Sequence, residues 1–269
     1  MPSIALTIAG SDPSGGAGIQ ADLKTFHQFG IYGQAAITLI TVQNTVGVRR
    51  VECLAPDLVV EQIEAVLDDL PPAAAKTGAL GNRAIVEAVA GLARRFAFPL
   101  VVDPVMVSKH GAPLIAGEAR EVLIRELIPQ ARLITPNLPE AEALTELSIR
   151  TMDDMRRAAL RLREMGAAAV LIKGGHLSGD AIDVLVDGDA WHEYTAARID
   201  TRHTHGTGCT YSAAITACLA LGMPLPDAVG RAKAFITEAI RTNPGLGAGA
   251  GPVNHFAVSA GLRGARRSL

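Results

Sequence analysis

Residues 4–29 read IALTIAGSDPSGGAGIQADLKTFHQF. Ile4–Ala9 is a short and mostly apolar run, which is typical of a strand buried on both faces. Gly10–Gly15 is rich in glycine and serine and predicts a loop, and Gly18–Phe29 has the apolar spacing of a helix. Because a buried strand followed by a helix is the repeating unit of parallel sheets covered by helices, this stretch predicts an α/β fold.

Strand and helix patterns alternate along the rest of the chain in the same way. We expect strands at Ala36–Val42, Val48–Leu54, Ala74–Thr77, Leu100–Asp103, Leu133–Thr135 and Ala169–Lys173. We expect helices at Pro56–Leu70, Asn82–Phe96, Gly117–Leu127, Leu138–Thr145, Met152–Met165, Gly208–Leu221 and Leu225–Arg241. Ala181–Val186 and Ala190–Thr195 flank Asp187-Gly188-Asp189, which predicts a hairpin. The sequence therefore predicts a three-layer αβα sandwich whose central sheet is mostly parallel with an antiparallel edge.

The composition narrows the class of protein. The chain has 269 residues, of which 49% are hydrophobic and 4% aromatic, so its core must be aliphatic, as buried parallel strands require. No linker or repeat divides it, and we expect one domain over residues 1–269, with a loosely ordered tail over 243–269 that is rich in glycine, alanine and proline. The longest uncharged stretch, Gly206–Pro226, contains polar residues and prolines and predicts a buried helix rather than a membrane span.

Charge and cysteine content argue against several classes of partner. The formal net charge is −2, which argues against nucleic acid, and we interpret the basic cluster Arg263–Arg267 as a solvated tail. Cys53, Cys209 and Cys218 have no metal-binding spacing, and their odd number argues against a disulfide framework. The N-terminus lacks the basic region of a signal peptide, so we expect a reducing, cytoplasmic environment.

Polar residues follow several of the predicted strands at the point where each strand ends. They are Asp12, Gln43, Asn44, Asp103, Asn137 and Lys173. Because ligands of open α/β sheets bind at the carboxyl ends of the strands, these residues predict a ligand site there.

The segment Thr204-His205-Gly206-Thr207-Gly208-Cys209-Thr210 places two glycines and a cysteine at the start of a predicted helix. The first backbone N–H groups of a helix have no partner within it and carry partial positive charge, so they form an anion site. A thiol at that position should have a lowered pKa and more thiolate character. The alternative is that Cys209 is a small core residue, as we expect for Cys53 and Cys218. His205 either lines the site or makes a structural hydrogen bond.

The glycine-rich first loop also allows more than one interpretation. Gly16-Ala17-Gly18-Ile19-Gln20-Ala21 fits the loose dinucleotide pattern, but the loop is long and Gln43-Asn44 stands where an acid would hold a ribose. No P-loop pattern is present in the sequence. The loop is then either a structural turn or a loop that lets the backbone approach a small substrate. We prefer the second interpretation.

Asp103, Asn137, Glu140 and Lys173 are candidates for a phosphate and metal site. Asp103 ends a buried strand and can hold Mg²⁺ through water, or it is a cap. Asn137 and Glu140 have the spacing of a helix capping box, which explains both without a ligand. Lys173 precedes two glycines and can reach a phosphate, or it is a solvated loop residue.

Taken together, these segments resemble the ribokinase-like family of small-molecule kinases, and more narrowly the hydroxymethylpyrimidine/phosphomethylpyrimidine kinases of thiamine biosynthesis. The resemblance covers almost the whole chain and rests on AGSDPSGGAGIQAD (9–22), TVQNT (41–45), VDPVM (102–106), TPN (135–137) and HGTGC (205–209). It implies a ribokinase-like fold and the phosphorylation of 4-amino-5-hydroxymethyl-2-methylpyrimidine, and then of its monophosphate, with ATP and Mg²⁺. It also implies a homodimer.

The resemblance assigns roles to individual residues. It implies that the substrate is bound by Gly10, Asp12, Ala17, Gln43 and Val105, with Gln43 at the pyrimidine edge and the first loop closed over the ring. It implies that the nucleotide is bound by Asn137, Lys173 and Thr207, and that Mg²⁺ lies near Asp103 and Glu140. The catalytic residues are then Lys173, Gly206, Thr207, Gly208 and Cys209, with Cys209 in place of the aspartate base of most relatives.

Two alternatives to this activity remain open. A pyridoxal kinase can use the same scaffold, and a pyrimidine-binding regulator can keep the fold without catalysis, although a regulator needs no γ-phosphate site. One departure from the family is Ala79 in Lys76-Thr77-Gly78-Ala79-Leu80, where many relatives are expected to have a larger apolar residue such as methionine. This departure concerns the tightness of the pyrimidine pocket.

Overall fold

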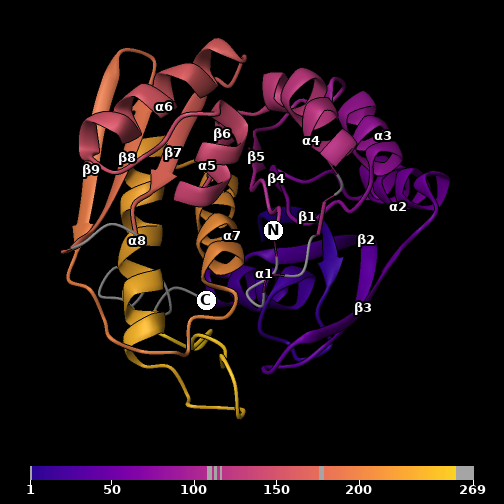
Figure 1. Cartoon of the computed structure of the whole chain (residues 1–269). Helices are drawn as coiled ribbons and strands as arrows, with labels where there is room; N and C mark the ends of the chain where they lie inside the picture. Colours follow the sequence, from indigo (N-terminus) through magenta and orange to yellow (C-terminus); the bar gives the residue numbers. More distant parts are fainter. Residues whose placement is uncertain (1, 108–110, 112–113, 116, 176–178, 259–269) are drawn as a thin grey trace.

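One sheet forms the centre of the part of the chain that the structure describes, which is residues 2–107, 111, 114–115, 117–175 and 179–258 (Figure 1). The structure is a computed structural model. The strands are β1 (Ile4–Ser11), β2 (Tyr32–Gln43), β3 (Val48–Cys53), β4 (Ala74–Thr77), β5 (Leu100–Val102), β6 (Leu133–Ile134), β7 (Ala169–Lys173), β8 (Ala181–Asp187) and β9 (Ala190–Ala196). Within these residues the sheet has nine strands in the order β3-β2-β1-β4-β5-β6-β7-β8-β9.

The middle of the sheet is parallel and both of its edges are antiparallel. β2, β1, β4, β5, β6 and β7 pair in parallel, so that Leu6 of β1 faces Gln34 on one side and Ala75 on the other. β3 runs antiparallel to β2, and β8 and β9 form the predicted hairpin beside β7. The prediction of a mostly parallel sheet with an antiparallel edge is confirmed. The short extra strand expected near Val48 forms a second antiparallel edge.

Helices cover both faces of the sheet (Figure 1). They are α1 (Gly18–Gln28), α2 (Pro56–Asp69), α3 (Arg83–Ala93), α4 (Gly117–Val122), α5 (Leu138–Thr145), α6 (Met152–Glu164), α7 (Thr207–Ala220) and α8 (Leu225–Arg241). One hydrophobic core lies between the sheet and α2 to α6, and it includes Ile8 and Ile63. The other lies between the sheet and α1, α7 and α8, and it includes Phe26 and Phe235. The three-layer αβα sandwich is therefore confirmed.

Helix α7 is buried on nearly all sides, and its composition explains how. The helix reads TGCTYSAAITACLA, and small side chains let it contact α1, α8 and strands β1, β4 and β5 at short range. Its N-terminus follows Gly206, which has a φ of 76°. A β-carbon at Gly206 would lie 1.7 Å from the backbone oxygen of Gly16, so the start of α7 packs directly on the first loop.

The chain after α8 returns to the start of α7. The backbone N–H of His205 donates to the oxygen of Gly251, and that of Val253 donates to the oxygen of His205. Val253 and His255 are buried, and the backbone N–H of Asn254 bonds the end of α8. Within the tail expected to be loosely ordered, residues 243–258 are thus held by these contacts. Residues 259–269, with the basic cluster Arg263–Arg267, lie outside the described residues.

None of the helices in the described ranges is long and apolar enough to cross a membrane. The uncharged stretch Gly206–Pro226 forms α7 and the start of α8. Several element bounds differ by a few residues from the predicted ones. The helix predicted at Gly117–Leu127 is α-helical only to Val122 and continues as a π-helical turn over Leu123–Leu127, and β2 is longer than predicted. That strand begins at Tyr32 because its N-terminal residues continue the parallel pairing with β1.

Candidate active site

A pocket of about 850 Å³ opens at the carboxyl ends of the parallel strands. Its lining includes every residue to which the sequence assigned a role: Gly10, Asp12, Ala17, Gln43, Asp103, Val105, Asn137, Glu140, Lys173, Gly206, Thr207, Gly208 and Cys209. These residues come from the ends of β1, β2, β5, β6 and β7 and from the start of α7. The convergence follows from parallel pairing, which brings the carboxyl ends of successive strands to one side of the sheet.

The start of α7 forms one wall of the pocket. The first intrahelical bond runs from the N–H of Thr210 to the oxygen of Gly206, so the amides of Gly208 and Cys209 precede the helical ladder. The N–H and hydroxyl of Thr207 instead both donate to the oxygen of Thr204. The anion site predicted at this helix start is therefore best supported at Gly208 and Cys209, and Thr207 is already engaged within the loop.

Asp103 and Lys173 form an ion pair directly beneath this helix start. Lys173 Nζ lies 3.1 Å from Asp103 Oδ1, and the two side chains are 13% and 2% exposed. A β-carbon on Gly208 would lie 3.4 Å from Lys173 Nζ, so only glycine leaves this space open. Thr135 and Ser212 also donate hydrogen bonds to the carboxylate. Burial alone would raise the pKa of Asp103, but Lys173 and Lys76 outweigh it and hold that pKa below its ordinary value.

The capping box predicted at Asn137 and Glu140 is confirmed. The Asn137 side chain accepts from the N–H of Glu140, and Glu140 Oε2 accepts from the N–H of Asn137, which completes the capping box of α5. Both residues also line the pocket. Burial raises the pKa of Glu140 to about 7, with Lys173 partly opposing the rise. Glu140 therefore changes its charge near neutral pH.

The expectation of a lowered pKa for Cys209 is wrong. Burial raises the pKa of this thiol to about 12, although Lys76 and a hydrogen bond from the backbone of Gly18 oppose the rise. The residue as a whole is half-buried and its side chain lines the pocket. Helix starts do lower thiol pKa values, but here the thiol is buried and loss of solvation is the larger effect.

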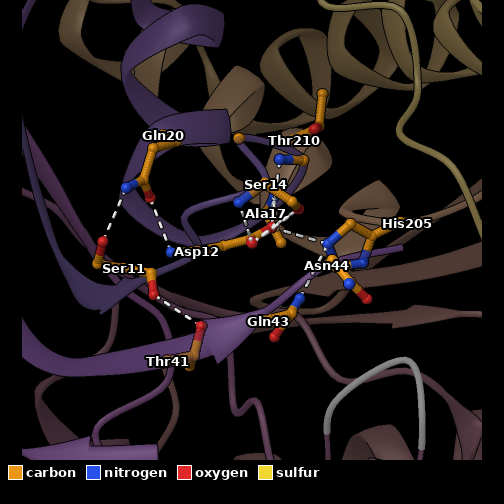
Figure 2. A network of polar contacts seen from close by, with 12 residues as sticks. Ser11, Asp12, Ser14, Ala17, Gln20, Thr41, Gln43, Asn44, His205 and Thr210 are labelled. Carbon is orange, nitrogen blue, oxygen red and sulfur yellow. Dashed lines mark hydrogen bonds and ion pairs between the residues drawn. The ribbon is translucent and has the colours of Figure 1, made fainter. Parts of the chain in front are cut away.

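Asp12, which lines the pocket, organises the first loop through its carboxylate. Its two oxygens accept hydrogen bonds from the backbone N–H groups of Ser14, Gly16 and Ala17, and from the Ser14 hydroxyl. Figure 2 shows the loop wrapped around this carboxylate. The pKa of Asp12 is lowered, because hydrogen bonds from His205 and Ser14 outweigh burial. The backbone of the loop, at Gly10 and Ala17, is what faces the pocket.

Gln43 and His205 line the pocket beside the first loop. Gln43 ends β2, and its amide lies 3.0 Å from His205 Nε2, which is also 2.8 Å from Asp12 Oδ2 (Figure 2). His205 is buried, so it makes a structural hydrogen bond and lines the site at the same time. Both alternatives proposed for His205 from the sequence therefore apply. Val105 and Ala79 complete this side of the pocket.

Two lysine–aspartate pairs near the site were not singled out from the sequence. Lys76 on β4 and Asp22 on α1 are 0% exposed, with Nζ 2.8 Å from Oδ2. Lys233 on α8 lies 2.7 Å from Asp183 Oδ2, whose partner oxygen accepts from the N–H of Gly174. A signal was available for the first pair, since Lys76 interrupts a short buried strand and Asp22 lies on the apolar face of its helix.

The site fits a magnesium ion that arrives with a nucleotide. Among the described residues, no three histidine, cysteine or acidic side chains are grouped to hold a metal by themselves. Mg²⁺ commonly uses one or two carboxylates together with water and substrate phosphates. Asp103 and Glu140 supply two buried carboxylates that share Lys173 as a neighbour, which suits this mode.

Comparisons with known proteins support a kinase site. A family model described as phosphomethylpyrimidine kinase matches residues 12–254. The hydroxymethylpyrimidine/phosphomethylpyrimidine kinase of Bacillus subtilis is 48% identical over 256 residues, which cover 94% of each chain. The thiamine biosynthesis bifunctional protein ThiED of Geobacter sulfurreducens is also 48% identical over 96% of this chain, which spans only 53% of that longer protein.

Solved structures share the fold. A phosphomethylpyrimidine kinase from Clostridium difficile is 48% identical with a TM-score of 0.79 and covers 88% of this chain and 99% of its own. A pyridoxal kinase from Bacillus subtilis, solved as an ADP complex, is 40% identical with a TM-score of 0.88 and covers 96% of this chain and 98% of its own. The family match, the identity over nearly the full length and the shared fold agree. This chain therefore belongs to the phosphomethylpyrimidine kinase family.

Proposed function

We propose that this protein transfers the γ-phosphoryl group of ATP to 4-amino-5-hydroxymethyl-2-methylpyrimidine and then to the resulting monophosphate, in thiamine biosynthesis. The observation that carries the proposal is the pocket itself. An acceptor side made by the first loop and Gln43 and a phosphate side made by Gly208, Lys173 and Asp103 line one continuous cavity. A pyrimidine-binding regulator needs only the acceptor side.

Phosphoryl transfer depends on position and charge more than on covalent chemistry. On the phosphate side, Lys173 and the amides of Gly208 and Cys209 hold the transferring oxygens. Asn137 places the start of α5 beside the nucleotide phosphates. Asp103 and Glu140 hold Mg²⁺ when it is bound, and the ion neutralises charge on the phosphates. The ADP complex of the pyridoxal kinase from Bacillus subtilis supports a nucleotide in such a pocket.

On the acceptor side, the backbone at Gly10 and Ala17 lies against the pyrimidine ring, Val105 packs on it and Gln43 reads its edge. Cys209 lies where both sides meet, next to the reacting oxygen. In the first step the thiolate form of Cys209, which the raised pKa keeps scarce at neutral pH, takes the proton of the hydroxymethyl group. In the second step the nucleophile is a phosphate that is mostly dianionic at pH 7, because its second pKa is about 6, so no base is needed.

The proposed function is tested by measuring each phosphorylation separately with purified enzyme, Mg·ATP and the pyrimidine alcohol or its monophosphate. Cys209→Ala should slow the first step by about 10²–10⁴-fold and leave the second nearly unchanged. The wild-type rate of the first step should rise between about pH 7 and about pH 9, because thiolate increases as pH approaches the pKa of about 12. Equal losses in both steps, or a flat profile, would assign Cys209 a positioning role instead. No turnover of either pyrimidine would reject the function.

Pyridoxal is a second candidate acceptor. The observation that favours it is the ADP complex of a pyridoxal kinase, which matches this chain with a TM-score of 0.88. Ala79 lines the acceptor side and leaves room for a larger ring than methionine would. Comparing kcat/KM for the two alcohols decides between them, and a higher value for pyridoxal would replace the pyrimidine assignment.

A homodimer and a cytoplasmic location complete the proposal. Ile40 and Val42, which share one face of β2, are 47% and 42% exposed, and Val46 at the following turn is 65% exposed. Apolar side chains grouped on an edge hairpin are typical of a contact between subunits. Sedimentation of the wild type against Ile40→Lys tests the dimer. The described cysteines are free thiols, which suits a reducing compartment.

A further inference from the structure

One ring nitrogen of His205 has two polar neighbours, one that needs a hydrogen-bond donor and one that needs an acceptor. His205 Nε2 lies 2.8 Å from Asp12 Oδ2 and 3.0 Å from Gln43 Nε2 (Figure 2). An imidazole nitrogen either carries a proton and donates, or lacks one and accepts. The amide nitrogen of Gln43 is a donor only, whereas a carboxylate is an acceptor only. The two contacts therefore make opposite demands on the same atom.

The charge of Asp12 determines whether His205 Nε2 carries a proton. Its Oδ1 accepts from the N–H of Ser14, and its Oδ2 accepts from the N–H groups of Gly16 and Ala17 at 3.2 and 2.9 Å. A carboxyl group surrounded by fixed backbone donors is ionised, because a proton on it would face another N–H. His205 Nε2 must then carry the hydrogen that it shares with Asp12. It has no lone pair left for Gln43.

The amide of Gln43 has only one orientation that suits this donor. With its nitrogen toward His205, two N–H groups would oppose each other at 3.0 Å. A half-turn about the last side-chain bond places the carbonyl oxygen there instead, where it accepts from the same N–H as Asp12 does. The amide NH₂ is then directed away from His205, into the pocket that Gln43 lines.

We propose that Asp12 and His205 lock the Gln43 amide with its oxygen on the histidine and its NH₂ toward the substrate, so that the site selects rings with a nitrogen acceptor at that edge. His205 is a positioning residue, and Gln43 is the residue that reads the ring. This inference rests on the proposed function for its ligand. A ring with C–H at that edge leaves a buried amide hydrogen without a partner, which weakens binding.

The surroundings of His205 keep this arrangement fixed. A β-carbon on Gly16 would lie 2.5 Å from His205 Cδ2, so the ring is packed tightly against the first loop. The backbone of His205 is held on both sides by Gly251 and Val253. The imidazole therefore cannot turn away from Asp12 without moving two segments of the chain.

The test compares two ligands by calorimetry without nucleotide. One is 4-amino-5-hydroxymethyl-2-methylpyrimidine, and the other is 2-amino-4-methylbenzyl alcohol, which has C–H in place of both ring nitrogens. The ratio of their dissociation constants measures selectivity, and comparing this ratio between variants cancels the different hydration of the ligands. Gln43→Glu keeps the shape and the acceptor for His205 but loses the donor, so selectivity should fall about tenfold.

Three further variants separate locking from folding. His205→Leu removes the donor that orients the amide and should lower selectivity at least about threefold, whereas His205→Gln places an N–H at the same reach and should restore it. Gln20→Met is the matched control. Gln20 accepts from the N–H of Asp12 and donates to Ser11, so it supports the loop without contacting His205, and selectivity should stay unchanged.

Each outcome has a clear meaning. Unchanged selectivity in either Gln43→Glu or His205→Leu would overturn the inference, and so would an equal fall in the Gln20→Met control. If His205→Leu does not fold, His205→Asn, whose side chain is shorter than the imidazole, takes its place. Binding of pyridoxal in place of the pyrimidine alcohol by the wild type would reject the proposed substrate instead, which is a different result from lost selectivity.

Discussion

Two lysine–aspartate pairs, one built on Lys76 of β4 and the other on Lys173 of β7, differ in their access to solvent. The Lys76–Asp22 pair, here the sealed pair, is 0% exposed on both sides. The Lys173–Asp103 pair, here the open pair, borders the pocket and is 13% and 2% exposed. In the sealed pair both carboxylate oxygens bond Lys76, and Thr7 donates to one of them. The open pair has a single contact between lysine and carboxylate, at 3.1 Å.

The difference indicates that the sealed pair has a structural role, whereas the lysine of the open pair can also contact a ligand in the pocket. Burial alone would lower the pKa of Lys76, but Asp22 outweighs it and raises that pKa, so the lysine stays charged. All the polar atoms of the sealed pair are satisfied within the protein. Lys173 instead borders the open space at Gly208, where we propose that it binds a phosphate. The two pairs should therefore respond differently to the same substitution.

The largest expected effect comes from breaking the sealed pair. Lys76→Met should lower the free energy of unfolding by about 3–5 kcal/mol, because it leaves Asp22 buried without its counter-charge. The double variant Lys76→Met/Asp22→Leu should recover most of that loss, because no lone buried charge remains. Urea unfolding measures both. A double variant as unstable as the single one would show that packing, rather than charge, explains the loss.

The same substitution in the open pair should instead act on the reaction. Lys173→Met should reduce kcat about 10²–10³-fold, which is typical for loss of one preorganised donor to the transition state. Its effect on unfolding should be smaller than that of Lys76→Met, because water from the pocket can reach Asp103. Initial rates at saturating ATP and urea unfolding test this contrast. It fails if Lys173→Met unfolds as easily as Lys76→Met.

Glu140 adds a pH dependence beside the open pair. Its pKa in the folded protein is about 7, above the ordinary value of 4.5, so the folded state holds this proton more tightly than the unfolded state. The stability that this group contributes is present below about pH 4.5 and is lost as pH rises to about 7. Glu140→Gln should therefore stabilise the protein at pH 8 relative to pH 5, by at most about 3 kcal/mol.

Unfolding of Glu140→Gln and wild type at both pH values measures this difference. Glu121→Gln removes the same charge from an exposed position of α4 and serves as the control. A pH-independent difference for Glu140→Gln would contradict the raised pKa.

The smallest effects are expected at the glycines beside the two pairs. In Gly78→Ala the new β-carbon lies 2.8 Å from that of Ala9, next to Lys76, and should cost about 1–3 kcal/mol of stability through overpacking. In Gly208→Ala it lies in ordinary contact with Lys173, so the fold should tolerate it while the methyl group fills the phosphate space. We expect kcat/KM to fall about tenfold or more in Gly208→Ala and to change much less in Gly78→Ala. Similar kinetics of both folded variants would contradict the assignment of the phosphate side.

The position of the site could be predicted because it depends on local order. Asp103, Asn137 and Lys173 each follow a strand, and parallel pairing brings the ends of those strands together. The hairpin at Asp187-Gly188-Asp189 and the bounds of α5 and α8 follow from turn and capping residues in the same way. The same local signals found the capping box of Asn137 and Glu140 without showing that both line the pocket.

Contacts between distant residues could not be predicted. Lys76 and Asp22 are separated by 54 residues in the sequence, and no local sequence pattern near either residue predicts that they form an ion pair. The pKa of Cys209 depends on how closely the start of α7 packs against α1 and the sheet, so the helix-start rule gave the wrong direction. The carboxylate of Asp12 turns into its own loop because the backbone N–H groups there converge, which only the folded loop reveals.

The return of the chain to His205 has a consequence for biosynthesis. Gly251 and Val253 hold the residue that orients Gln43, and His255 bonds Thr210 in the first turn of α7. A nascent chain receives the whole sheet and all the described helices before these residues, because they come last in the described part of the chain. The acceptor side is therefore completed only after the rest of the described fold has been synthesised.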